Sequence, residues 1–156
     1  HIAGDAIAGG AGTRSAEQRS LGGAAFYNVY RTRDARHIAL GGREAKFVAN
    51  LLTALDAAHL IPLGDAPAGP AQAPLGDFLS AAFAQRTRDE WIAWFADKDV
   101  AFAPVLDFRE ALDQPHIAER GLLVEADGAH QIAPAIRFAG EPEWAPRPAP
   151  DLGAGG

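Results

Sequence analysis

The spacing of apolar and polar residues in the first half of the chain predicts a pair of strands. Aromatic and β-branched side chains alternate with others from Phe26 to Arg31, and a shorter apolar run covers residues 37–40. Alternation of this kind is typical of strands. The tripeptide Arg33-Asp34-Ala35 lies between the two runs, where a hairpin would turn, although a glycine would suit such a turn better. We therefore expect an antiparallel hairpin over residues 26–40.

A helical period begins directly after the glycine pair Gly41-Gly42. Six positions fall on one face of a helix by their spacing: Glu44, Phe47, Val48, Leu51, Leu52 and Leu55. All but the first are apolar, so this face is expected to be buried. Glu44 is the exception, and we expect it at the N-terminal end of the buried stripe.

Two more amphipathic helices are predicted further along. Prolines and glycines make residues 62–74 a loop, and residues 75–83 again show the helical spacing. Thr87 and Glu90 match a capping box, in which each side chain bonds the other's backbone N–H. The helix that they open is expected to bury an apolar face made of Trp91, Ile92, Trp94 and Phe95.

The last third of the chain shows shorter elements. Residues 100–105 are apolar but contain Pro104, which cannot donate to a ladder, so they form an edge strand or an extended crossing. Asp107 with Glu110 predicts a short helix, and Pro115 opens one more helical turn that ends at Gly121. Asp127-Gly128 indicates a second hairpin turn.

Locally paired strands and segregated helices favour an α+β fold, a small antiparallel sheet of hairpins packed with amphipathic helices. We expect residues 1–22 to be a linker or irregular arm and residues 23–140 to be one small α+β domain. Residues 141–156 are rich in proline and glycine and are expected to form an extended tail without a core.

The amino-acid composition argues against several classes of binding partner and of metal site. The 156 residues carry a formal net charge of −6 and no cysteine. An acidic chain is a poor match for nucleic acid or an anionic membrane surface, and thiolate metal sites are impossible without cysteine. The histidines lack metal-ligand spacing, so we expect no metal. We see neither a signal peptide nor a membrane-spanning segment.

Two features near the first helix deserve a chemical interpretation. Gly41-Gly42 lacks the spacing of the known phosphate-binding loops, so it is either a tight turn or a backbone against which a ligand group lies. Glu44 is either a first-turn acid placed by the helix dipole or a carboxylate that orients an imidazole. The residues alone leave both alternatives open and show no complete catalytic constellation.

Three segments, taken in order, match a known family. Residues 26–47 read FYNVYRTRDARHIALGGREAKF, residues 86–125 read RTRDEWIAWFADKDVAFAPVLDFREALDQPHIAERGLLVE, and residues 148–153 read PAPDLG. This succession resembles the C-terminal part of family III CoA transferases (CaiB/BaiF type), in particular the α-methylacyl-CoA racemase-like branch. The Asp-Gly turn usual in that family reads Asp34-Ala35 here.

The resemblance implies an enzyme and a place for this chain within it. Such enzymes are interlocked homodimers whose active site lies between a large Rossmann-like domain of one subunit and a small α+β domain of the other. The chain resembles the small domain and lacks the large one. In the racemases, a His and an Asp of the large domain remove and return the α-proton, supported by a small-domain glutamate that matches Glu44. Candidate substrate-binding residues are Tyr30, Arg31, Gly41 and Gly42.

The expected function is racemisation or epimerisation of 2-methylacyl-CoA thioesters by a cytoplasmic enzyme of fatty acid metabolism. Coenzyme A enters as part of the substrate, and no cofactor is expected. One alternative is a CoA transferase that moves CoA between carboxylic acids through an aspartyl intermediate. Another is a non-catalytic dimerisation or interaction lobe. Because the acid and base of the large domain are missing, we expect the chain alone to be inactive.

Overall fold

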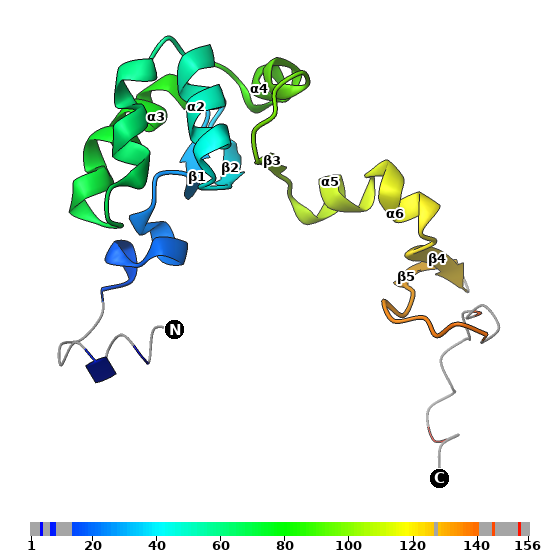
Figure 1. The fold of residues 1–156 in the computed structure, drawn as a ribbon. Helices are drawn as coiled ribbons and strands as arrows, with labels where there is room; N and C mark the ends of the chain where they lie inside the picture. Colours follow the sequence, from blue (N-terminus) through cyan, green and yellow to red (C-terminus); the bar gives the residue numbers. More distant parts are fainter. Residues whose placement is uncertain are drawn as a thin grey trace. The chain divides into compact units, whose positions relative to one another are not determined.

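The computed structural model describes residues 4, 7–8, 14–126, 128–140, 145 and 153. The chain divides into two compact units, His1–Val105 and Leu106–Gly156 (Figure 1). The stretch 23–140, expected as one domain, therefore extends over both units. Within the arm expected over residues 1–22, the described part contains two short helical turns, η1 (Ser15–Glu17) and η2 (Arg19–Gly23).

The first unit contains a three-stranded antiparallel sheet. The predicted hairpin is confirmed as β1 (Tyr27–Arg31) and β2 (His37–Gly41), and β3 (Phe102–Val105) pairs with the other side of β2. Since the strand order is β1-β2-β3, β3 lies at an edge, where the missing N–H of Pro104 is tolerated. The prediction of an edge strand is thus confirmed.

One face of this sheet carries the core. Tyr30, Ile38 and Leu40 are buried there, as alternation along the two strands requires. Helices α2 (Ala45–Ala54) and α3 (Ala73–Phe83) lie in the same unit as this sheet (Figure 1). Their apolar side chains join those of the strands in one core. Their buried residues repeat at the predicted helical spacing: Val48, Leu51 and Leu52 in α2, and Leu75, Leu79 and Phe83 in α3.

Aromatic rings join α3 to α4 (Arg88–Phe95). The rings of Phe83 and Trp91 meet edge to face with centroids 5.1 Å apart, and the Trp91 indole N–H donates to the Phe83 carbonyl at 2.9 Å. Phe95 stacks on Phe102 of β3 at 4.0 Å. The buried indole therefore has its hydrogen-bond partner, and α4 is fixed to both α3 and the sheet.

Three expectations for this unit are wrong in detail. Glu44 does not head the buried stripe: α2 begins at Ala45, and the Glu44 side chain is exposed. Ile92 is 39% exposed, because it lies about 100° around the helix from the buried Trp91. Residues 62–74 are not plain loop, because 3₁₀ turns η3 (Ala58–Asp65) and η4 (Pro70–Gln72) and the start of α3 occupy much of them.

A buried amide ties these turns to the entry of the sheet. The Gln72 side chain accepts from the Ala25 backbone N–H at 2.8 Å and donates to the Ala66 carbonyl at 2.7 Å. Beside it, the Gly69 N–H donates to the Gly23 carbonyl at 2.7 Å. These bonds satisfy buried and partly buried backbone groups, so they fix the chain immediately before β1.

The second unit contains small elements only. The predicted capping box of Asp107 and Glu110 is confirmed and opens α5 (Phe108–Leu112), which is followed by α6 (Pro115–Glu119). The predicted hairpin is formed by β4 (Leu123–Ala126) and β5 (Ala129–Ile132), with Gly128 at φ 72° in the turn. Asp127 of that turn and most of the tail lie outside the described residues.

The observed mixture of small antiparallel sheets and amphipathic helices confirms the α+β class. Among the described helices, none has the length and apolar character needed to cross a membrane.

Candidate functional site

Glu44 is placed by the turn that joins β2 to α2. It is the N-cap residue of α2, with extended backbone at φ −58° and ψ 135°. Its carbonyl accepts from the N–H groups of Phe47 and Val48, but its carboxylate makes no capping bond. Short polar side chains such as Asp commonly cap the first turn from this position, and the longer Glu is not among the preferred caps. Here the side chain is exposed and available for another partner.

Gly42 makes room for this arrangement. It is buried, and a Cβ built on it would lie 2.6 Å from Phe47 Cδ2, 2.7 Å from Ala101 Cβ and 2.9 Å from Glu44 Oε2. Contacts this short are not tolerated, so any side chain at residue 42 would displace the Phe47 ring or the Glu44 carboxylate. The second glycine of the pair is therefore required by packing.

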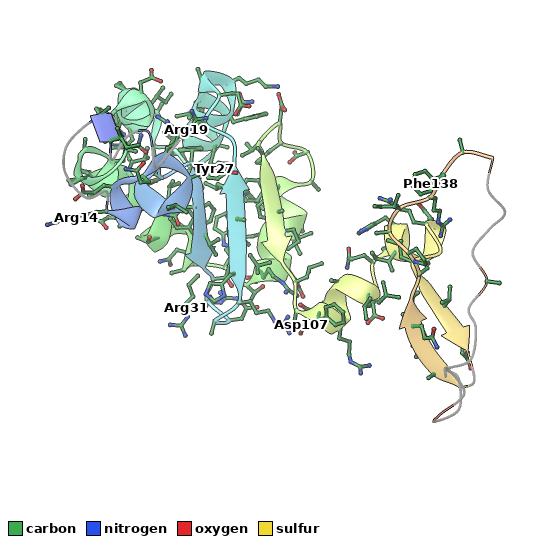
Figure 2. All side chains as sticks on the ribbon, turned by 90° about the horizontal axis from the view of Figure 1, so that it is seen from below. Arg14, Arg19, Tyr27, Arg31, Asp107 and Phe138 are labelled. Carbon is green, nitrogen blue, oxygen red and sulfur yellow. The ribbon has the colours of Figure 1, made fainter. Side chains whose placement is uncertain are left out.

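The Glu44 hollow is a small open depression of about 410 Å³. It is lined by Arg19, Tyr27, Gly41, Arg43 and Glu44. Tyr27 and Gly41 are register partners at one end of the β1–β2 hairpin, Arg43 and Glu44 follow in the next turn, and Arg19 comes from η2. Figure 2 labels Arg19 and Tyr27, with Arg31 at the other end of β1. Three separate segments thus bring two guanidinium groups, a phenol and a carboxylate together.

A second, larger groove of about 830 Å³ contains other predicted substrate-binding residues. Tyr30 and Arg31 line it, together with residues of the arm, η4 and α3. Tyr30 belongs chiefly to the core: its side chain is buried, its hydroxyl donates to the Ala25 carbonyl at 2.6 Å, and burial raises its pKa. Arg31 is exposed.

The structure therefore separates the predicted site residues. Gly41 and Glu44 share the small hollow, Gly42 is packed behind it, and Tyr30 and Arg31 line the larger groove. We take the Glu44 hollow as the candidate site, although it is the smaller one, because it contains Glu44, the predicted catalytic residue, with its side chain exposed. The roles of Tyr30 and Arg31 in substrate binding stay predictions.

Sequence reasoning missed three residues of the Glu44 hollow. Tyr27 could have been found, because strand alternation puts it on the face opposite the buried Tyr30, and hairpin register brings it beside Gly41. Arg43 is adjacent to Glu44 in sequence. Arg19 had no detectable signal, because the turn of η2 that carries it follows no periodic pattern.

Two other carboxylates near the sheet have structural partners. The Thr32 hydroxyl donates to Asp34 at 2.5 Å and the Arg88 backbone N–H donates to it at 3.2 Å, which lowers the Asp34 pKa. The Thr87 backbone N–H donates to Glu90 at 2.7 Å and Arg33 forms an ion pair with it at 2.9 Å, which lowers the Glu90 pKa. Both acids serve the hairpin turn and the start of α4.

Metal binding has no support in the described ranges: no group of three or more His, Cys, Asp or Glu side chains there is arranged to hold an ion.

Comparisons with known proteins agree with this architecture. The sequence model of CoA-transferase family III matches residues 2–155. The chain is 30% identical to human alpha-methylacyl-CoA racemase over 136 residues, which are 84% of this chain and 31% of the relative. The mouse alpha-methylacyl-CoA racemase is 33% identical over 119 residues, 72% of this chain and 29% of the relative. The chain thus spans about a third of the length of these curated relatives.

A solved structure shares the fold. The protein Rv3272 of Mycobacterium tuberculosis superposes with a TM-score of 0.60 at 21% identity, over 78% of this chain and 34% of that one. An orthorhombic crystal form of the same protein gives a TM-score of 0.59 over 72% of this chain and 32% of that one. At this identity the likeness concerns the fold alone.

Proposed function

Because the chain belongs to CoA-transferase family III, we propose that it is part of an enzyme that racemises or epimerises 2-methylacyl-CoA thioesters. The two mammalian relatives named above are alpha-methylacyl-CoA racemases, which supports this branch of the family. The observation that carries the proposal is the Glu44 carboxylate, which is exposed in a polar hollow and is not used by the helix that it precedes.

The chemistry requires a base, an acid and a means of keeping both in place. A thioester makes the hydrogen on the neighbouring carbon acidic, so a base on one face can remove it and an acid on the other face can return it. A carboxylate beside a catalytic imidazole fixes its tautomer and orientation. We assign this positioning role to Glu44, with the acid and base supplied by the large domain of the other subunit in an interlocked homodimer. The proposal includes the cytoplasmic location expected from the sequence.

The test is α-proton exchange in the full-length enzyme that contains this chain. We expect a 2-methylacyl-CoA to exchange its α-hydrogen with solvent deuterium, monitored by NMR or mass spectrometry. Glu44→Gln keeps the size of the side chain but removes the charge, so exchange should slow on the order of 10²–10⁴-fold, the range for an acid–base group that loses its protonation or orientation.

The matched control is Asp77→Asn, because Asp77 lines the larger groove and not the Glu44 hollow. Exchange at the wild-type rate is expected in this variant. If Glu44→Gln were fully active and Asp77→Asn inactive, the site would have to be moved to the larger groove. A covalent acyl-enzyme trapped by hydroxylamine would instead indicate a transferase.

The 156-residue chain by itself is expected to leave acyl-CoA unchanged. Among the described residues that line the Glu44 hollow, none is a histidine or a second carboxylate, so they supply no acid–base pair for two-sided proton transfer. Turnover of any 2-methylacyl-CoA by the purified chain would contradict the division of the site between two domains.

A further inference from the structure

The Glu44 hollow contains more positive charge than its carboxylate can neutralise. Of the described residues that line it, Arg19 and Arg43 are basic and Glu44 alone is acidic. In the part of the chain that the structure describes, no ion pair joins either arginine to a carboxylate. The hydrogen bond of Arg43 to the Gly64 carbonyl is long, at 3.5 Å. The residues of this hollow therefore carry a net charge of +1, although the formal net charge of the whole chain is −6.

The larger groove gives a useful contrast. Its arginines, Arg31 and Arg33, share it with Glu17 and Asp77. Arg33 is also held by Glu90 at 2.9 Å, so the charges there are balanced within the unit. The excess of guanidinium is therefore a property of the Glu44 hollow and not of every depression in this unit.

Guanidinium groups recognise planar anions. An arginine can donate two parallel N–H bonds to one carboxylate, and such charge-assisted bonds are stronger than neutral ones. The Tyr27 phenol, register partner of Gly41, adds one more donor at the same rim. Two arginines and a phenol thus make a set of donors for an anionic group that enters beside Glu44.

We propose that this hollow binds a carboxylate at the far end of the acyl group, so that the preferred substrate is the CoA thioester of a 2-methyl dicarboxylic acid. The assignment rests on the proposed function, since it takes Glu44 to mark the reacting end of the substrate. An anion bound in the same hollow as Glu44 is close to the α-carbon. The phosphates of coenzyme A are separated from that carbon by the whole pantetheine arm and fit less well.

The kinetic test uses the full-length enzyme and two thioesters of similar shape. One is 2-methylsuccinyl-CoA with the thioester next to the methyl-bearing carbon, and the other is 2,4-dimethylpentanoyl-CoA, in which an isopropyl group replaces the carboxylate. The kcat/KM for α-proton exchange should be at least about tenfold higher for the first, the minimum expected from one charged hydrogen bond. Arg19→Gln and Arg43→Gln should each bring the ratio close to one by raising the KM of the dicarboxylic thioester.

The control is Arg14→Gln, because Arg14 is exposed directly before η1 and pairs with Glu17 outside the hollow. It should retain the full preference. The same pair of acyl groups on pantetheine, which lacks the nucleotide phosphates, should retain it as well. A preference that disappears on pantetheine would assign the arginines to a phosphate of coenzyme A and overturn the proposal. So would equal kcat/KM values for the two CoA thioesters in a wild-type enzyme that depends on Glu44.

If neither thioester exchanges its α-hydrogen, that result counts against the proposed function itself. A direct binding measurement then tests the anion site independently of catalysis. The 156-residue chain is titrated with succinate and with succinamide, its neutral analogue, while backbone amide signals are followed by NMR. Succinate should shift the signals of residues 41–44 and succinamide should not, and Arg19→Gln or Arg43→Gln should weaken the succinate effect at least tenfold. Equal responses to both compounds, or unchanged binding in the variants, would remove the anion site.

Discussion

Ala35 holds the turn of the β1–β2 hairpin in a left-handed backbone conformation, with φ at 61°. Its N–H donates to the Thr32 carbonyl at 3.0 Å, and the Thr32 N–H donates to Arg36 at 2.9 Å, so the turn is closed on both sides. The left-handed region costs an L-residue with a Cβ about 1–2 kcal/mol, and glycine avoids that cost. Ala35 therefore adopts the left-handed conformation that glycine would adopt in an Asp-Gly turn, although alanine is less favourable there.

Ala35→Gly should therefore stabilise the protein. Relief of the strained conformation outweighs the extra freedom of glycine in the unfolded chain, for a net gain of up to about 1 kcal/mol. Thermal unfolding followed by circular dichroism should show a midpoint raised by roughly 4 °C. Ala39→Gly in β2 is the control, because a strand position gains nothing from glycine and should lose stability. A lower midpoint in Ala35→Gly would mean that the turn is not strained.

At the scale of elements, sequence patterns predict the start of a helix correctly where hydrogen bonds between residues close in sequence determine it. Thr87 with Glu90, and Asp107 with Glu110, were recognised as capping boxes because both bonds of each box form within four residues. The same reasoning failed at Glu44, where the helix begins one residue later than the apolar spacing suggested. It also could not predict the Glu44 hollow, because Arg19 reaches that place only through contacts between distant segments.

The carboxyl groups of Glu90 and Asp34, near the start of α4, should make the free energy of unfolding depend on pH in the acidic range. Hydrogen bonds from Thr87 lower the Glu90 pKa, with a contribution from Arg33, and the bond from Thr32 lowers the Asp34 pKa. A carboxyl with a lowered folded-state pKa stabilises the fold above its unfolded value, here 4.5 for Glu90 and 3.8 for Asp34. That contribution is lost as the pH falls through the lower folded value.

The unfolding midpoint should accordingly begin to fall below about pH 4.5 and keep falling in stronger acid. Glu90→Gln and Asp34→Asn should each be less stable than wild type at pH 7 and should show a shallower decline in acid. Glu119→Gln in α6, outside this network, should follow the wild-type curve. Wild-type and Glu90→Gln curves that run parallel from pH 7 to pH 2 would contradict the assignment. The measurement is thermal unfolding by circular dichroism across this pH range.

At the scale of the whole molecule, the two units differ in how many apolar side chains they bury. Every buried apolar residue found among the described positions belongs to His1–Val105, apart from Ala133. The second unit instead exposes large apolar side chains: Phe108, Ile132, Ile136 and Phe138. An isolated two-stranded hairpin is marginally stable in water, so β4 and β5 gain little from their own packing. Exposed apolar groups of this kind are what a larger protein would cover.

Hydrogen exchange of the 156-residue chain should therefore separate the two units. Amides of β2, which is paired on both sides, should be protected, whereas those of β4 and β5 should exchange early because little apolar surface opposes their opening. A shortened chain ending at Leu106 retains the aromatic core and the bond from Arg88 to the Val105 carbonyl. Its unfolding midpoint should lie within about 4 °C of the full chain, the shift that roughly 1 kcal/mol produces. Equal protection of β2 and β5 would contradict this separation. A shortened chain that no longer unfolds cooperatively would show that the core of the first unit needs residues 107–156.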